Sequence, residues 1–178
     1  DAVPQLTGAN IPFVIRLRVV LLRDLGAPLS PFNAFQIIQG LETVGLRMKQ
    51  HCSNAEKVVS FLETQKKVTN VIYPTNHQGE IKERAKRYMK GGYGSLVGMD
   101  VGTKENGAKF IDNLKMLYHV ANIGDARSLA IHPATTTHSQ LNDKELLAAG
   151  VTPGYVRLSI GIEGPVGIIA DIKQALAA

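Results

Sequence analysis

The sequence predicts a mixed α/β (α+β) fold, with long amino-terminal helices leading into a small mixed or antiparallel sheet covered by helices. Helical spacing of apolar residues dominates the first third of the chain, and strand-like and helix-like segments alternate after it. The 178 residues are 44% hydrophobic and 20% charged, which is enough for one sizeable core. We therefore expect helices over residues 1–50 that link to another part of the protein, and a small domain over residues 51–178.

Two helices are expected before the sheet. Apolar residues recur at helical spacing over 13–25, and Gly26 stands where a helix commonly ends. Ser30 is a candidate N-cap and Pro31 suits the first helical position, so a long helix should begin there and continue to about Glu63. That helix has two glycines near which a bend is expected, Gly40 and Gly45.

The remaining elements follow from changes in the period of the apolar residues. Strands are expected at 68–73, 95–101, 128–131 and 155–160. Helices are expected at 79–89, at 107–118 and from Pro165 onward. The polar run at 135–144 is the best candidate for a loop, and such loops often carry function.

Composition argues against several classes of protein. The net charge is +5, but acids are interspersed, and the basic cluster at 82–90 is typical of a solvated helix face, so no nucleic-acid partner is expected. No apolar stretch of about 18 residues exists and Asp1–Gly8 lacks the features of a secretory signal, so no membrane partner is expected. The single cysteine, Cys52, has no partner for a disulfide and no zinc-type spacing, which favours a cytoplasmic protein without a bound metal.

Arg157 is the first candidate for a binding residue. In the strand at 155–160, Val156, Leu158 and Ile160 share one face and Tyr155, Arg157 and Ser159 share the other. A guanidinium in an otherwise apolar strand needs an anion or water, and its fork geometry suits a carboxylate. A structural salt bridge or a solvent-facing side chain is the more common explanation for such a residue, and spacing alone favours it over a ligand role.

The segment 122–138 is the second candidate, because hydroxyl residues surround two histidines. Ser128 and the threonines at 135–137 can donate to an anion, although such residues also commonly bond their own backbone. His132 and His138 match no common zinc spacing, and Ser128 lacks the GxSxG setting of a nucleophile.

Three stretches resemble, in order, the carboxyl-terminal part of the fold-type I pyridoxal-phosphate enzymes of cysteine and methionine metabolism. The stretches are LLRDLGAPLSPFNAFQIIQGLETVGLRMKQH (21–51), HVANIGDARSLAIHPATTTHSQL (119–141) and GVTPGYVRLSIGIEG (150–164). The family includes cystathionine γ-synthase, cystathionine γ-lyase, methionine γ-lyase and O-acetylhomoserine sulfhydrylase. Asn122-Ile123-Gly124-Asp125 is similar to the sulfhydrylases, whereas relatives acting on cystathionine commonly have a Gly-Gly version of this segment.

The resemblance implies roles for individual residues. Arg157 occupies the place of the arginine that binds the substrate α-carboxylate in the family's VRLS-G-E motif. Ser128 and Leu129 match a Ser-Leu pair near the substrate, and Thr136 or Thr137 is expected to approach the same pocket. The implied activity is conversion of O-acetylhomoserine and sulfide to homocysteine and acetate, a step of methionine biosynthesis; methionine γ-lyase and cystathionine γ-synthase activities remain alternatives.

The chain also departs from the family in an informative way. The family's cofactor lysine in its Ser-x-Thr-Lys setting, the aspartate for the pyridine nitrogen, the Gly-rich phosphate cradle and the stacking tyrosine are all missing from this sequence. We therefore expect pyridoxal phosphate to be held by a preceding part, with no catalytic residue in this chain and no activity from it alone. Such a chain can also be a silent isolated fragment. The resemblance further implies a homo-oligomer, a tetramer, as the working form.

Overall fold

A computed structural model of the chain describes residues 11–178. Residues 1–10, which contain the segment inspected for a secretory signal, lie outside the described residues. The chain divides into two compact units, Asp1–Thr43 and Val44–Ala178. No helix in the described range is long and apolar enough to cross a membrane.

The described part of the first unit is helical, as predicted. It contains α2 (Pro12–Arg16), a π-helical segment η1 (Leu17–Leu22), α3 (Arg23–Leu25) and α4 (Pro31–Glu42). Gly26 follows α3 with a left-handed φ of 63°, the conformation that ends helices and favours glycine. The Ser30 hydroxyl accepts a hydrogen bond from the Asn33 N–H at 3.1 Å, which confirms the predicted N-cap.

The side chains of this unit are largely uncovered. Phe32 on α4 is 67% exposed and Leu41 is 60% exposed, and none of residues 11–43 is buried. The predicted long helix is interrupted at Thr43, between the two glycines, and α5 (Val44–Leu62) belongs to the second unit. Helical periodicity was therefore the right signal, and the break lies within three residues of both glycines near which a bend was expected.

The second unit is built on a five-stranded sheet with the order β1-β2-β5-β4-β3. Its strands are β1 (Asn70–Ile72), β2 (Leu96–Asp100), β3 (Tyr118–His119), β4 (Leu129–Ile131) and β5 (Tyr155–Ser159). All pairs are antiparallel except β3 with β4, which is parallel, so the mixed sheet expected from the sequence is confirmed. The central strand β5 is therefore flanked on both sides by strands distant in sequence.

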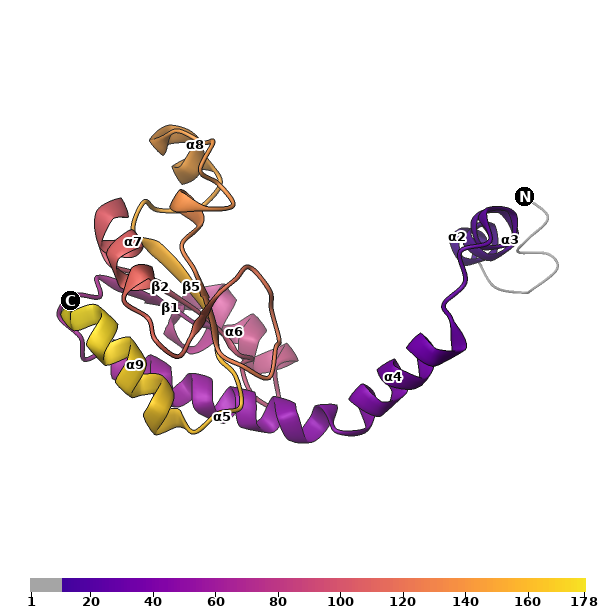
Figure 1. Ribbon diagram of the computed structural model, residues 1–178, viewed down its shortest axis with the longest axis horizontal. Coiled ribbons are helices and arrows are strands. Elements are labelled where there is room, and N and C mark those ends of the chain that lie inside the picture. The colour runs from indigo at the N-terminus through magenta and orange to yellow at the C-terminus, as the bar shows by residue number, and fades with distance from the viewer. Residues whose placement is uncertain (1–10) are drawn as a thin grey trace. The chain divides into compact units, whose positions relative to one another are not determined.

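Helices cover one face of this sheet. Helix α5 lies beside α9 (Pro165–Ala177), which also contacts α7 (Lys104–Asp112) (Figure 1). Alternate residues of the strands point toward these helices and, with apolar residues of all three helices, form the core. Val97, Val156 and Leu158 in the strands, and Val58, Ile168 and Ile172 in the helices, are fully buried. The opposite face, which carries Arg157, is less covered.

The remaining elements lie in the connections. They are η2 (Pro74–Asn76), α6 (Gly79–Tyr88), η3 (Pro133–Thr135) and α8 (Asp143–Ala148). Helix α7 begins at Lys104, before its predicted start, because the Thr103 hydroxyl caps it by accepting from the Asn106 N–H. Helix α8 begins inside the predicted loop at 135–144. Its capping box joins Asn142 and Glu145, a pattern that was visible in the sequence.

Candidate functional site

Arg157 lies in the middle of the less covered sheet face. It is half-buried on β5, with Gly98 of β2 opposite it on one side and Ile131 of β4 on the other. One guanidinium nitrogen, Nη2, donates to the Ala121 carbonyl at 2.6 Å, whereas Nε is buried and has no hydrogen-bond partner among the described residues. No carboxylate of residues 11–178 forms an ion pair with this guanidinium. The arginine therefore retains donor capacity for an anion.

A hollow of about 200 Å³ lies beside Arg157 on the same face. Arg157, Tyr155 and Gly98 form part of its wall, and the segment after β1 completes it with Pro74 and His77. The other lining residues are Ile72, Tyr73, Leu96 and Val97. The guanidinium thus borders an open, mostly apolar surface, where an ionic contact is less screened than in bulk water.

The loop at 121–128 is held against the sheet by residues of β5 and the turn after it. Arg157 bonds the Ala121 carbonyl, and the Ser159 hydroxyl accepts from the Gly124 N–H at 3.2 Å. The Ile162 N–H donates to the Ala126 carbonyl at 2.9 Å. The Asn-Ile-Gly-Asp segment that resembles the sulfhydrylases is therefore placed next to Arg157 by hydrogen bonds to the backbone of the loop.

Ser128 and Leu129 are buried where this loop enters β4. Ser128 is 0% exposed; its N–H donates to Glu163 Oε1 at 2.6 Å and its hydroxyl donates to Glu163 Oε2 at 2.9 Å. The same hydroxyl accepts from the Gly161 N–H at 2.9 Å. Leu129 is 2% exposed and pairs with Ser159. Both residues form the base of the 121–128 loop, and their proximity to substrate stays a prediction.

Glu163, the last residue of the stretch VRLSIGIE, is a further member of this region to which sequence reasoning assigned no role. Its carboxylate joins the turn after β5 to Ser128, the residue before β4, which lies 35 positions away along the chain. The available signal was an acid four residues after a buried strand, where a half-buried carboxylate needs hydrogen-bond donors. Sequence spacing alone does not show which donors it meets.

Glu163→Gln is expected to lower the stability of the second unit by about 1–2 kcal/mol, because the amide cannot accept both Ser128 donors. Hydrogen exchange at the amides of the 121–128 loop should quicken in the same variant. Glu56→Gln on the outer face of α5 is the matched control. Equal exchange in all three proteins would contradict the role of Glu163 in holding the loop.

Thr136 lies after η3, away from this hydrogen-bonded base. It is half-buried, and its hydroxyl donates to the His132 carbonyl at 2.8 Å. Such bonding of a threonine to nearby backbone was one of the two interpretations of this segment. No hydrogen bond joins it to Arg157 in the part of the chain that the structure describes. The Thr137 hydroxyl lies 2.9 Å from His138 Nδ1. A substrate contact by Thr136 or Thr137 therefore stays a prediction.

His132 has a structural environment. It is 0% exposed, with Nε2 at 2.7 Å from the Pro153 carbonyl and Nδ1 at 2.9 Å from the Thr135 hydroxyl. Burial lowers the pKa of this imidazole, which favours the neutral ring. A Cβ at Gly107 would lie 2.4 Å from Nε2, so the helix–imidazole contact requires glycine there. This histidine packs the η3 segment against α7.

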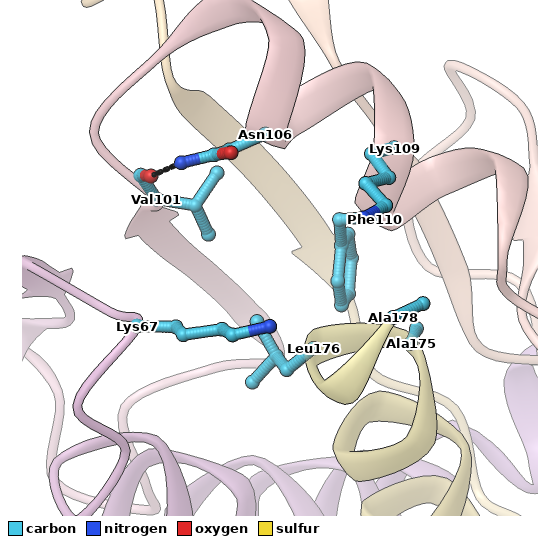
Figure 2. A pocket seen from close by; sticks show the side chains of 8 residues that line it. All are labelled: Lys67, Val101, Asn106, Lys109, Phe110, Ala175, Leu176 and Ala178. Atoms are coloured by element: carbon cyan, nitrogen blue, oxygen red, sulfur yellow. Dashed lines mark hydrogen bonds between the residues drawn. The ribbon is translucent and has the colours of Figure 1, made fainter.

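A second hollow, of about 180 Å³, lies between α7 and α9. Figure 2 shows Lys67 extended across it and the Phe110 ring standing at its side. The Lys67 ammonium donates to the Ala177 carbonyl at 3.3 Å. None of the four predicted site residues lines this hollow, so Arg157 and its surroundings remain the candidate site.

Comparison with known proteins agrees with the resemblance found in the sequence. Residues 9–177 match the family described as "Cys/Met metabolism PLP-dependent enzyme". The O-acetyl-L-homoserine sulfhydrylase of Leptospira meyeri is 50% identical over 171 residues, covering 95% of this chain and 39% of that protein. The homocysteine/cysteine synthase of Saccharomyces cerevisiae is 41% identical over 177 residues, covering 93% of this chain and 40% of that protein.

A solved structure shows the same fold. The O-acetylhomoserine (thiol)-lyase of Campylobacter jejuni, with N'-pyridoxyl-lysine-5'-monophosphate at position 205, superposes with a TM-score of 0.86 at 41% identity. The match covers 97% of this chain and 42% of that one. This chain is homologous to the carboxyl-terminal part of O-acetylhomoserine sulfhydrylases and spans about 40% of the length of the relatives it matches.

Proposed function

Since this chain belongs to the Cys/Met metabolism PLP-dependent enzyme family, we propose that it is the carboxyl-terminal part of an O-acetylhomoserine sulfhydrylase. The whole enzyme would convert O-acetylhomoserine and sulfide to homocysteine and acetate. Relatives at 41% to 50% identity that carry this or a synthase name support the assignment. This chain would contribute the arm that binds the substrate carboxylate, and it would be inactive alone.

The observation that carries this proposal is the unsatisfied guanidinium of Arg157. Its Nε is buried without a partner, and Nη2 is engaged only by backbone carbonyls. A carboxylate can accept two N–H groups from one guanidinium edge, which fixes both its distance and its orientation. A half-buried cationic donor of this kind fits the α-carboxylate of an amino acid better than it fits a neutral ligand.

Each residue has a limited task in this proposal. Arg157 binds and orients the carboxylate so that the Cα–H bond is presented in one direction, a positional effect that accelerates reaction. The 121–128 loop, held by Ser128 and Glu163, supports the guanidinium from one side, and Leu129 and Thr136 are predicted to approach the substrate. Pyridoxal phosphate, when bound by the preceding part, supplies the electron sink for negative charge at Cα.

The first unit supports a partner for this chain. Several of its apolar side chains, Phe32 and Leu41 among them, are more than half exposed, and a surface of that kind is typical of an interface. We infer that residues 1–50 link the small domain, 51–178, to the preceding PLP-binding part. A homo-oligomer, tetrameric as the family resemblance implies, belongs to the same proposal.

The test is a substrate comparison with the full-length enzyme, meaning this chain joined to the part that precedes it in its relatives. O-acetylhomoserine with sulfide should give homocysteine with a higher kcat/KM than cystathionine formation from cysteine or elimination from methionine. Residues 1–178 alone are the control and should show no turnover. A higher kcat/KM with methionine or cysteine would reassign the enzyme to a γ-lyase or to a cystathionine γ-synthase.

A further inference from the structure

Tyr155 has no assigned role, yet it lies beside the arginine on which the proposed function rests. The two side chains are two residues apart along β5, so they point to the same face of the sheet, and both line the same hollow. Tyr155 is half-buried although it faces the less covered side of the sheet. A large ring in this position has to rest on a neighbouring strand.

The neighbouring strand provides a seat for the ring at Gly98. This glycine is paired directly with Arg157, and Tyr155 is its diagonal neighbour across β2 and β5. A Cβ at position 98 would lie 2.7 Å from Cε2 of Tyr155 and 3.1 Å from its hydroxyl oxygen. The ring therefore covers the space next to Arg157 that a side chain on the paired residue would otherwise occupy.

The half-buried Arg157 side chain therefore has a neighbour on each adjacent strand. Ile131, which is 4% exposed, faces Arg157 from β4, and the ring seated on Gly98 lies on the β2 side. The tip is held by the Ala121 carbonyl. Burial raises the pKa of the Tyr155 hydroxyl and the positive charge of Arg157 opposes that rise, in keeping with their proximity.

We propose that Tyr155, seated on Gly98, is a positioning residue that keeps the Arg157 side chain extended and its guanidinium ready for the substrate carboxylate. An arginine carries many rotamers, and ordering it at the moment of binding weakens binding by up to about tenfold. A ring that orders the side chain beforehand removes that cost. The inference rests on the proposed function, because it acts through Arg157.

The test measures kcat and KM for the amino-acid substrate in the full-length enzyme. Tyr155→Ala should raise KM by about tenfold with kcat changed less than about twofold, because binding is lost equally in ground and transition states. Tyr155→Phe should keep the wild-type KM, since the ring is retained. Gly98→Ala should raise KM about threefold to fivefold by pushing the ring aside. Tyr88→Ala, which removes a tyrosine that is 71% exposed on α6, is the matched control.

A double mutant distinguishes a positioning role of Tyr155 from a general loss of structure, because only positioning makes the effects of the two substitutions on KM non-additive. In an Arg157→Ala background, Tyr155→Ala should add no further rise in KM, because the side chain that it positions is gone. If Tyr155→Ala fails to fold, as judged by thermal unfolding, Tyr155→Leu and Gly98→Ala give the decisive values. An unchanged KM in these variants, or a Phe variant as impaired as the Ala variant, would overturn the proposal. An Arg157→Ala enzyme with unchanged kcat/KM would instead refute the proposed function beneath it.

Discussion

Arg157→Ala in the full-length enzyme is expected to lower kcat/KM for the amino-acid substrate by about 100- to 1000-fold. Two charge-assisted hydrogen bonds to the α-carboxylate would be lost, each contributing about 1.5–2 kcal/mol. The loss should fall mainly on KM, because the carboxylate is bound in the ground state as well as in the transition state. Steady-state kinetics with O-acetylhomoserine and saturating sulfide measure both constants.

Arg157→Lys separates charge from geometry. A lysine keeps the positive charge but cannot bind a carboxylate with a two-pronged fork, so it should recover only a small part of the lost kcat/KM. Arg84→Ala, on the exposed side of α6, is the control for removal of an arginine. If Arg157→Ala retained the wild-type kcat/KM, the carboxylate would have to be bound elsewhere.

Asp171→Asn is expected to destabilise the second unit by about 3 kcal/mol at neutral pH. The two charged oxygens of the carboxylate are replaced by one neutral amide oxygen, which accepts fewer and weaker hydrogen bonds. Asp171 is 6% exposed on α9, and its carboxylate accepts from the N–H groups of Lys115, Met116 and Leu117 at 2.9, 2.8 and 3.0 Å. Gln174 Nε2 donates to it as well, at 3.0 Å. One carboxylate thus fixes the segment between α7 and β3 to α9.

The same contacts predict a dependence on pH. Burial alone would raise the pKa of Asp171, but the N–H donors at Leu117, Lys115 and Met116, with Gln174, bring it below its ordinary value. A lowered folded-state pKa stabilises the fold at pH above the unfolded value of about 3.9, and the stabilisation is lost as the pH falls through the folded-state pKa.

Amide hydrogen exchange followed by mass spectrometry measures this effect locally. Protection at residues 115–117 should fall sharply in Asp171→Asn at neutral pH, whereas Asp143→Asn at the start of α8 should leave it unchanged. Acidification from about pH 4 down through the lowered folded-state pKa should reduce the difference between the wild type and Asp171→Asn, because the wild-type carboxyl is then protonated. Equal protection in the two proteins at neutral pH would show that Asp171 does not hold this segment.

Local signals in the sequence were sufficient for most of the helices and strands. Apolar periodicity placed α6, α9 and the sheet strands β2, β4 and β5, because side-chain direction along a strand or helix depends only on spacing. The strand β3 was missed because two residues are too few to show a period. The π-helical segment η1 lies inside the helix predicted at 13–25, and only its hydrogen-bond pattern was missed. The end of α7 was misplaced because a distant carboxylate turns the chain after it.

The sequence by itself determined the fold class, the family and the candidate status of Arg157, since alternation along one strand and three linear motifs are local properties. Only the tertiary structure decided which groups meet Arg157 and which of its donors stay free. The contacts of Glu163 with Ser128 and of Asp171 with Leu117 join residues 35 and 54 positions apart. The seating of Tyr155 on Gly98 likewise depends on the register of β2 with β5. Such pairings arise from long-range packing, which spacing along one chain cannot encode by itself.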